Sequence, residues 1–332
     1  MLCRNVTRHP HMKTETKILI FLFFLSPIIG ELLTGSTPPL QFFNPFMFVI
    51  LSLLYGCGIL LIREARVRWN MQWSVIFFAI AYGILEEGTM IQSFFNPGHW
   101  HLGNLSGYGM YFGVMWSWAL MLILSHAAIS ILIPLAITNL TWPEYKDKSL
   151  INKKGIILSS MGFFGVAGFW IFLIIGRGAD EFYRNYVPDN KLVLGSFLLV
   201  LLLVWLAYYF RNSRLSSQNN VFSPFTFGVA GFSFMVINTF LQNMLASFEV
   251  PGIIAILIHL MFISLVSILA IREIYNRNTS RRHIVLLIFG SLLFWIVLSP
   301  IQEFINGVVG ITLFGMIGLI SLIYWRKKVS DN

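Results

Sequence analysis

The sequence predicts an all-α, polytopic membrane protein with about ten transmembrane helices and both termini in the cytoplasm. Hydrophobic residues make up 57% of the 332 positions and charged residues only 11%, whereas soluble domains carry about 25% charged residues. Apolar runs of about 20 residues, long enough to cross a bilayer as a helix, recur along the whole chain. The basic residues alternate between successive loops, which is typical of a multi-pass protein.

Ten apolar runs are predicted to span the membrane, and an even number returns the chain to the side where it began. They lie at 18–34, 43–62, 73–95, 110–138, 155–176, 192–210, 224–247, 252–271, 284–304 and 307–325. Together they form a single transmembrane domain, 18–325. It lies between an N-terminal cytoplasmic tail, 1–17, and a C-terminal cytoplasmic tail, 326–332.

Lysine and arginine test this topology because short loops rich in them stay in the cytoplasm. With the N-terminus inside, only Arg177, Arg184 and Lys191 fall outside. The net charge of +9 is therefore interpreted as contact with anionic headgroups on the cytoplasmic side of the bilayer. We expect a plasma (cytoplasmic) membrane location.

Several functions are disfavoured. No basic patch with interleaved aromatics suggests nucleic acid as a partner. No Gly-x-x-x-x-Gly-Lys-Ser/Thr, Gly-x-Gly-x-x-Gly or His-Glu-x-x-His motif is present, so neither a nucleotide nor another cofactor is predicted. Cys3 and Cys57 are not placed for a disulfide or a cysteine metal site.

Two adjacent carboxylates, Glu86 and Glu87, lie inside the apolar stretch 73–95. A charged side chain at the bilayer centre costs roughly 3 kcal/mol on insertion scales, so we expect the pair to face protein, water, an ion or a substrate. Successive helical residues point about 100° apart, and the two carboxylates need not meet the same neighbour. A protonated glutamate that hydrogen-bonds across the bundle is the structural alternative.

Other polar residues fall in the same predicted outer half of the membrane. With a rise of ~1.5 Å per residue, Glu31 lies about 6 Å deep, the glutamate pair about 12 Å and His259 about 10 Å, whereas His126 comes to about 22 Å. The predicted substrate- or ion-binding residues are Glu31, Glu86, Glu87, Asn238, Gln242, Asn243 and Glu303. For Asn238, Gln242 and Asn243, interhelical hydrogen bonding and cavity lining both remain open.

His99 and His101, in the loop after the glutamate pair, are weak candidates for an outer metal site. No cysteine or third fixed ligand lies near them in the sequence. We favour a role as interfacial anchors at the membrane surface.

The order of Glu86-Glu87, His126 and His259 resembles the CPBP family of intramembrane proteases, which includes the CAAX-processing enzymes. The family motifs are Glu-Glu-x-x-x-Arg, Phe-x-x-x-His and His-x-x-x-Asn. Ile91, Leu122 and Ile263 stand at the three supporting positions. The resemblance implies that Glu86 or Glu87 activates a water, that His126 and His259 orient it or stabilise the oxyanion, and that the substrate is a peptide bond at the membrane.

Three functions are therefore compared. The first is a proton- or cation-coupled carrier of a small solute, in which the buried glutamates bind the coupling ion. The second is a CPBP-like hydrolase with Glu86, Glu87, His126 and His259 as catalytic residues. The third is a non-catalytic membrane assembly subunit. The carrier is the preferred hypothesis because it requires no fixed triad geometry.

Overall fold

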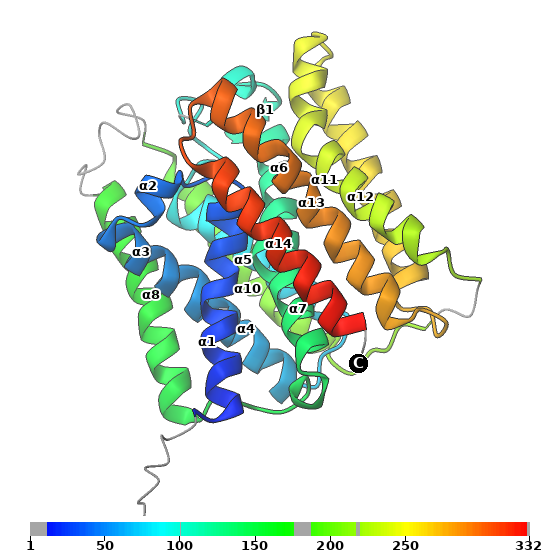
Figure 1. Cartoon of the computed structure of the whole chain (residues 1–332). Helices are drawn as coiled ribbons and strands as arrows, with labels where there is room; N and C mark the ends of the chain where they lie inside the picture. The colour runs from blue at the N-terminus through cyan, green and yellow to red at the C-terminus, as the bar shows by residue number, and fades with distance from the viewer. Residues whose placement is uncertain (1–11, 100, 176–186, 217–219, 331–332) are drawn as a thin grey trace, which may run out of the picture.

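The computed structural model describes residues 12–99, 101–175, 187–216 and 220–330, and most of these are helical. Eight of their helices are long and apolar enough to cross a membrane, so the predicted multi-pass helical character is confirmed. Helix α1 begins and α14 ends at the same end of the bundle (Figure 1). Which end faces the cytoplasm stays a prediction. Cys3, Arg177 and Arg184 lie outside the described residues.

The N-terminal half combines α-helices with short π-helical segments, labelled η1, η2, η3 and η5. Its elements are α1 (Thr14–Pro27), η1 (Ile28–Leu33), α2 (Pro39–Phe42), α3 (Pro45–Leu51), η2 (Ser52–Gly56), α4 (Cys57–Arg68), α5 (Val75–Ile84), η3 (Leu85–Met90), the 3₁₀ turn η4 (Gly103–Leu105), β1 (Met110–Tyr111), β2 (Val114–Met115), α6 (Trp116–Ser125), η5 (His126–Leu132), α7 (Ile133–Thr141) and the 3₁₀ turn η6 (Pro143–Tyr145).

The C-terminal half consists of long, uninterrupted helices. They are α8 (Lys153–Ile175), α10 (Asn190–Tyr209), α11 (Pro224–Ser247), α12 (Gly252–Ile274), α13 (Arg281–Asn306) and α14 (Ile311–Ser330). Figure 1 shows α13 and α14 side by side across the face of the bundle, with α11 and α12 at its edge.

The structure corrects the start of the fourth predicted span. Residues 110–115 form an antiparallel hairpin, in which Met110 pairs with Met115, and the helix begins only at Trp116. Phe112 and Gly113 at the turn have φ angles of 54° and 78°, the left-handed conformation that two-residue hairpin turns require. Hydropathy cannot separate this apolar hairpin from a helix, because both read as an uncharged run.

Two predicted spans are helical but are not among the eight that meet the length and hydropathy requirements. The third is formed by α5 and η3, which end at Met90, and Gln92 then adopts a φ of 60°. The tenth is α14, whose last turn carries Arg326, Lys327 and Lys328.

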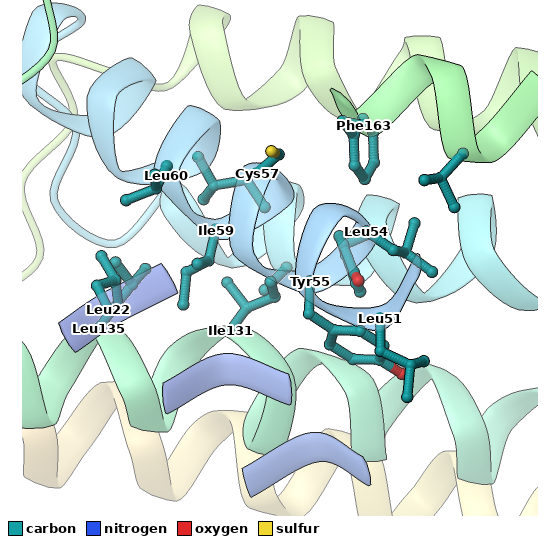
Figure 2. Packing of buried hydrophobic residues seen from close by; sticks show 14 of the residues in the cluster. Leu22, Leu51, Leu54, Tyr55, Cys57, Ile59, Leu60, Ile131, Leu135 and Phe163 are labelled. Atoms are coloured by element: carbon teal, nitrogen blue, oxygen red, sulfur yellow. The ribbon is translucent and has the colours of Figure 1, made fainter. Parts of the chain in front are cut away.

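Burial divides the helices into central and peripheral ones. In the span Pro45–Arg68, 61% of the apolar window is buried, against 17% for Gly252–Ile274. The largest hydrophobic cluster surrounds η2 and α4, where Leu54, Tyr55, Ile59 and Ile131 pack together (Figure 2). The peripheral helices expose their apolar side chains, as expected for surfaces that face lipid.

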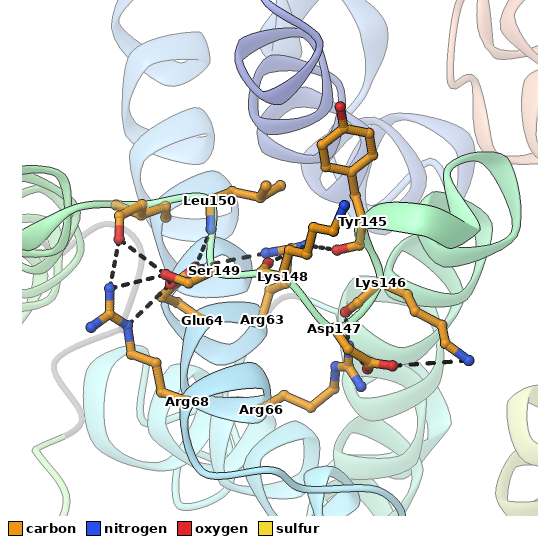
Figure 3. Close-up of polar contacts among 11 residues, drawn as sticks. Arg63, Glu64, Arg66, Arg68, Tyr145, Lys146, Asp147, Lys148, Ser149 and Leu150 are labelled. Atoms are coloured by element: carbon orange, nitrogen blue, oxygen red, sulfur yellow. Dashed lines mark hydrogen bonds and ion pairs between the residues drawn. The ribbon is translucent and has the colours of Figure 1, made fainter.

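A buried ionic network holds the end of α4 against the loop that follows η6 (Figure 3). The carboxylate of Glu64 accepts hydrogen bonds from Arg68 Nε at 3.0 Å and from the backbone N–H of Leu150 at 3.3 Å. Arg63 donates to the carbonyls of Tyr145 at 2.7 Å and Lys148 at 3.2 Å. Because these groups are removed from water, they need the partners that the loop supplies.

Candidate functional site

The π-helical segments place polar side chains side by side inside the bundle. Glu31 lies on η1, Tyr55 on η2, Glu86 and Glu87 on η3, and His126 on η5. We call these five residues the Glu–His cluster. π-Helical turns are rare, and they occur frequently at functional sites.

His126 joins the two glutamates of η3. Its Nδ1 lies 3.2 Å from Glu86 Oε2, and its Nε2 lies 3.3 Å from Glu87 Oε1. The hydroxyl of Ser130, one turn further along η5, lies 3.3 Å from Nδ1. Glu86 is 4% exposed, and the His126 side chain is 11% exposed. A single ring therefore contacts both carboxylates in a nearly closed site.

The sequence placed His126 deeper than the glutamate pair, and the structure corrects this. The six residues of Met110–Met115 belong to the hairpin, and removing them from the helix shortens the depth of His126 by roughly 9 Å. The side chain then lies level with η3.

Hydroxyl groups also hold the carboxylates of Glu87 and Glu31. Ser93 donates to Glu87 Oε2, and the Trp118 indole N–H in turn donates to Ser93 at 3.1 Å. Tyr55 donates to Glu31 Oε1, and Thr37 donates to Glu31 Oε2 at 2.6 Å. The Tyr55 and Trp118 contacts come from other spans, whereas Ser93 and Thr37 lie six residues from the glutamates they bind.

Two tyrosine rings line the space beside His126. The centroids of Tyr55 and Tyr82 are 5.7 Å apart, and each lies 6.4 Å from the imidazole centroid. Tyr82 is 3% exposed, and its buried side chain interacts with Glu86. Because buried tyrosine hydroxyls usually find a partner, Tyr82 adds a further polar group next to the glutamates of η3.

A second polar group lies on α11 and α12, and it contains His259. The His259 Nδ1 lies 2.8 Å from the side-chain amide of Gln242, and Asn238 donates to Ser125 Oγ at 2.9 Å and to the Met121 carbonyl at 3.1 Å. In the described part of the chain, His259 forms no hydrogen bond or ion pair with the Glu–His cluster. The structure therefore separates the two predicted histidines.

Two further predicted binding residues lie elsewhere. The Glu303 carboxylate accepts from the backbone N–H groups of Gly310 and Thr312 at 3.0 and 2.9 Å. It thus satisfies free donors where α14 starts, which is the usual work of a helix N-terminal cap. Asn243 is half-buried and makes no side-chain hydrogen bond within the described residues.

His99 and His101 contact each other, with ring centroids 5.7 Å apart. His99 is 6% exposed, and burial lowers its pKa to about 4. Among the described residues no group of three or more His, Cys, Asp or Glu side chains is arranged to hold a metal ion. His99 thus belongs to the packed loop beside Trp118, whose ring centroid is 6.2 Å away.

Four residues of this region are not predicted by the sequence pattern: Tyr55, Tyr82, Ser93 and Ser130. None carries a charge, so none interrupts the apolar pattern of its span. The tyrosines had a usable signal, because the hydroxyl of a Tyr buried in a transmembrane segment needs a polar partner.

No curated protein and no solved structure matches this chain. No match to the CPBP proteases is found either, and that resemblance is not confirmed. One family matches residues 20–323, a range that contains every member of the Glu–His cluster. The chain therefore belongs to this family, which is described as an uncharacterized membrane protein family.

Proposed function

We propose that the protein is a proton-coupled carrier of a small solute, in which the Glu–His cluster takes up and releases the proton. The observation that carries the proposal is the contact of both His126 nitrogens with carboxylates. A neutral imidazole has one N–H, and the charged form has two. The neutral ring can donate to only one glutamate, so the proton content of the cluster decides which of its hydrogen bonds exist.

The balance of charge supports the same conclusion. The cluster contains the carboxyl groups of Glu31, Glu86 and Glu87 but only one basic side chain, His126. Each uncompensated buried ion costs several kcal/mol. Protons are the smallest species that neutralise such a site, and a monovalent cation bound by the same carboxylates is the alternative coupling ion.

The position of the cluster links proton binding to helix movement. Glu86 and Glu87 belong to η3, and His126 belongs to η5, so a change in their hydrogen bonds alters how two helices hold each other. Carriers of this kind bind ions where membrane helices depart from regular α-helix, and they expose the site to either side in turn. The departures here are π-helical segments, which allow local shifts in the hydrogen-bond pattern.

The test is proton flux into proteoliposomes that enclose a pH-sensitive dye, driven by a potassium diffusion potential. Flux is measured with Na⁺, with K⁺ alone and with mixtures of amino acids or sugars as the added solute. We expect flux above that of protein-free vesicles for the wild type, and flux at the protein-free level for Glu87→Gln and His126→Gln. His259→Gln is the matched control and should retain the wild-type flux.

Two results would overturn the proposal. One is wild-type flux no greater than that of protein-free vesicles under every solute tested. The other is undiminished flux in both Glu87→Gln and His126→Gln. Correct folding of each variant is checked by size-exclusion chromatography and by its thermal unfolding midpoint.

A second candidate is hydrolysis of a peptide bond at the membrane. The contact between Glu87 and His126 at 3.3 Å supports it, since general-base catalysis needs such reach. In this function the hydroxyl of Tyr82, whose ring lies 6.4 Å from that of His126, would stabilise the oxyanion. Cleavage of a fluorescence-quenched CAAX-type peptide in detergent distinguishes the two functions: cleavage by wild type and loss in Glu87→Gln would favour the hydrolase.

A further inference from the structure

A groove of about 560 Å³ opens between α11, α13 and α14, away from the Glu–His cluster. Helix α13 packs against both α11 and α14 (Figure 1). Its volume is in the range of small-molecule sites, about 300–1,000 Å³. Most of the lining side chains are apolar, among them Phe225, Val229, Phe232, Leu286, Phe289 and Leu293.

Two glycines bring α11 and α13 unusually close at the groove. A Cβ atom on Gly290 would lie 1.9 Å from the carbonyl oxygen of Gly228, so α13 has no space for a side chain at this position. Small residues of this kind allow the backbones of membrane helices to touch. Where the backbones touch, the larger side chains on either side form the walls of a trough.

Two arginines from different helices complete the lining. Arg282 lies at the start of α13 and Arg326 in the last turns of α14. Both are exposed, and within the described ranges neither forms an ion pair with a carboxylate. The Arg326 guanidinium lies 5.4 Å from the ring centroid of Phe289, an apolar residue of the groove. Among the residues that the structure describes, no acidic side chain lines the groove.

The helix ends add to this positive field. Helix α11 begins at Pro224 and α13 at Arg281, so both start at the end of the groove that holds Arg282. The N-terminus of a helix carries a partial positive charge and favours phosphate.

We propose that this groove binds an anionic phospholipid, with an acyl chain along the apolar walls and the phosphate between Arg282 and Arg326. This end of the bundle is the one where the sequence predicts the cytoplasm, the side on which anionic lipids attract basic residues. A free phosphate would leave the apolar walls without a partner. The ammonium of a zwitterionic headgroup would meet two like charges. The inference does not depend on the carrier proposal.

The experiment uses the purified full chain in detergent with three probes: dioleoylphosphatidylglycerol, dioleoylphosphatidylcholine and water-soluble glycerol phosphate. Native mass spectrometry counts bound lipids, and the shift in thermal unfolding midpoint gives apparent affinity. We expect binding of phosphatidylglycerol, weaker binding of phosphatidylcholine and none of glycerol phosphate. Replacing both arginines with glutamine should weaken phosphatidylglycerol binding roughly 25-fold, the ordinary attraction of two basic residues to an anionic headgroup.

Two further variants keep the test decisive. Lys327→Gln combined with Arg277→Gln removes the same charge at the same end from residues that do not line the groove, and it should change affinity less than threefold. Val229→Trp fills the groove without changing its charge, so it should weaken the binding of phosphatidylglycerol. Equal binding of both lipids, equal losses in the two double variants, or competition by glycerol phosphate would each overturn the proposal.

Discussion

The bridge between His126 and Glu87 makes a sharp prediction about stability. The imidazole Nε2 and the carboxylate Oε1 are 3.3 Å apart, and both side chains are largely buried. A hydrogen bond to a charged group contributes about 1.5–3 kcal/mol to folding. A double-mutant cycle of His126→Gln and Glu87→Gln should therefore show a coupling free energy of about 1.5–3 kcal/mol.

The assay is the free energy of unfolding in mixed micelles, measured by SDS titration and read by circular dichroism, for wild type, the two single variants and the double variant. His259→Gln combined with Glu87→Gln is the control cycle, because His259 contacts Gln242 instead. Independent sites add within about 0.5 kcal/mol. A coupling below that value for His126, or an equal coupling for His259, would refute the assignment of the cluster.

Three further predictions concern the rest of the fold. Glu64→Gln should lower the free energy of unfolding by about 3 kcal/mol, because it leaves the 1% exposed Arg63 without its counter-charge; SDS titration measures it. The lowered pKa of His99, about 4, means that the unfolded chain binds more protons, so stability should fall as pH drops from 7 through 6.5 towards 4. Up to about 3 kcal/mol is lost, and His99→Gln, measured at pH 7 and 4.5, should remove this part of the pH dependence. Gly290→Ala should lower the free energy of unfolding by about 1–3 kcal/mol, because the added methyl overpacks against Gly228; the thermal unfolding midpoint should fall. Gly165→Ala should leave the midpoint unchanged, because no atom lies within 4 Å of the added Cβ.

Some residues of the site could be predicted from the sequence, and others could not. Glu86 and Glu87 stand out because a carboxylate in an apolar span is costly wherever the helix packs. Tyr55 donates a hydrogen bond to Glu31 in the same cluster, yet in the sequence it resembles one more apolar residue. The sequence grouped His259 with the glutamates by depth, but depth says nothing about which way a helix faces.

By itself, the sequence determined that this chain is helical and multi-pass, and it predicted a polar site among the apolar spans, because the cost of burying charge depends on composition along the chain. Only the tertiary structure decided which polar side chains contact one another. The rotation of each helix and its π-helical turns set which side chains meet, so His126 joins Glu86 and Glu87 while His259 pairs with Gln242. Those contacts are made across segments distant in sequence, and no local pattern specifies them.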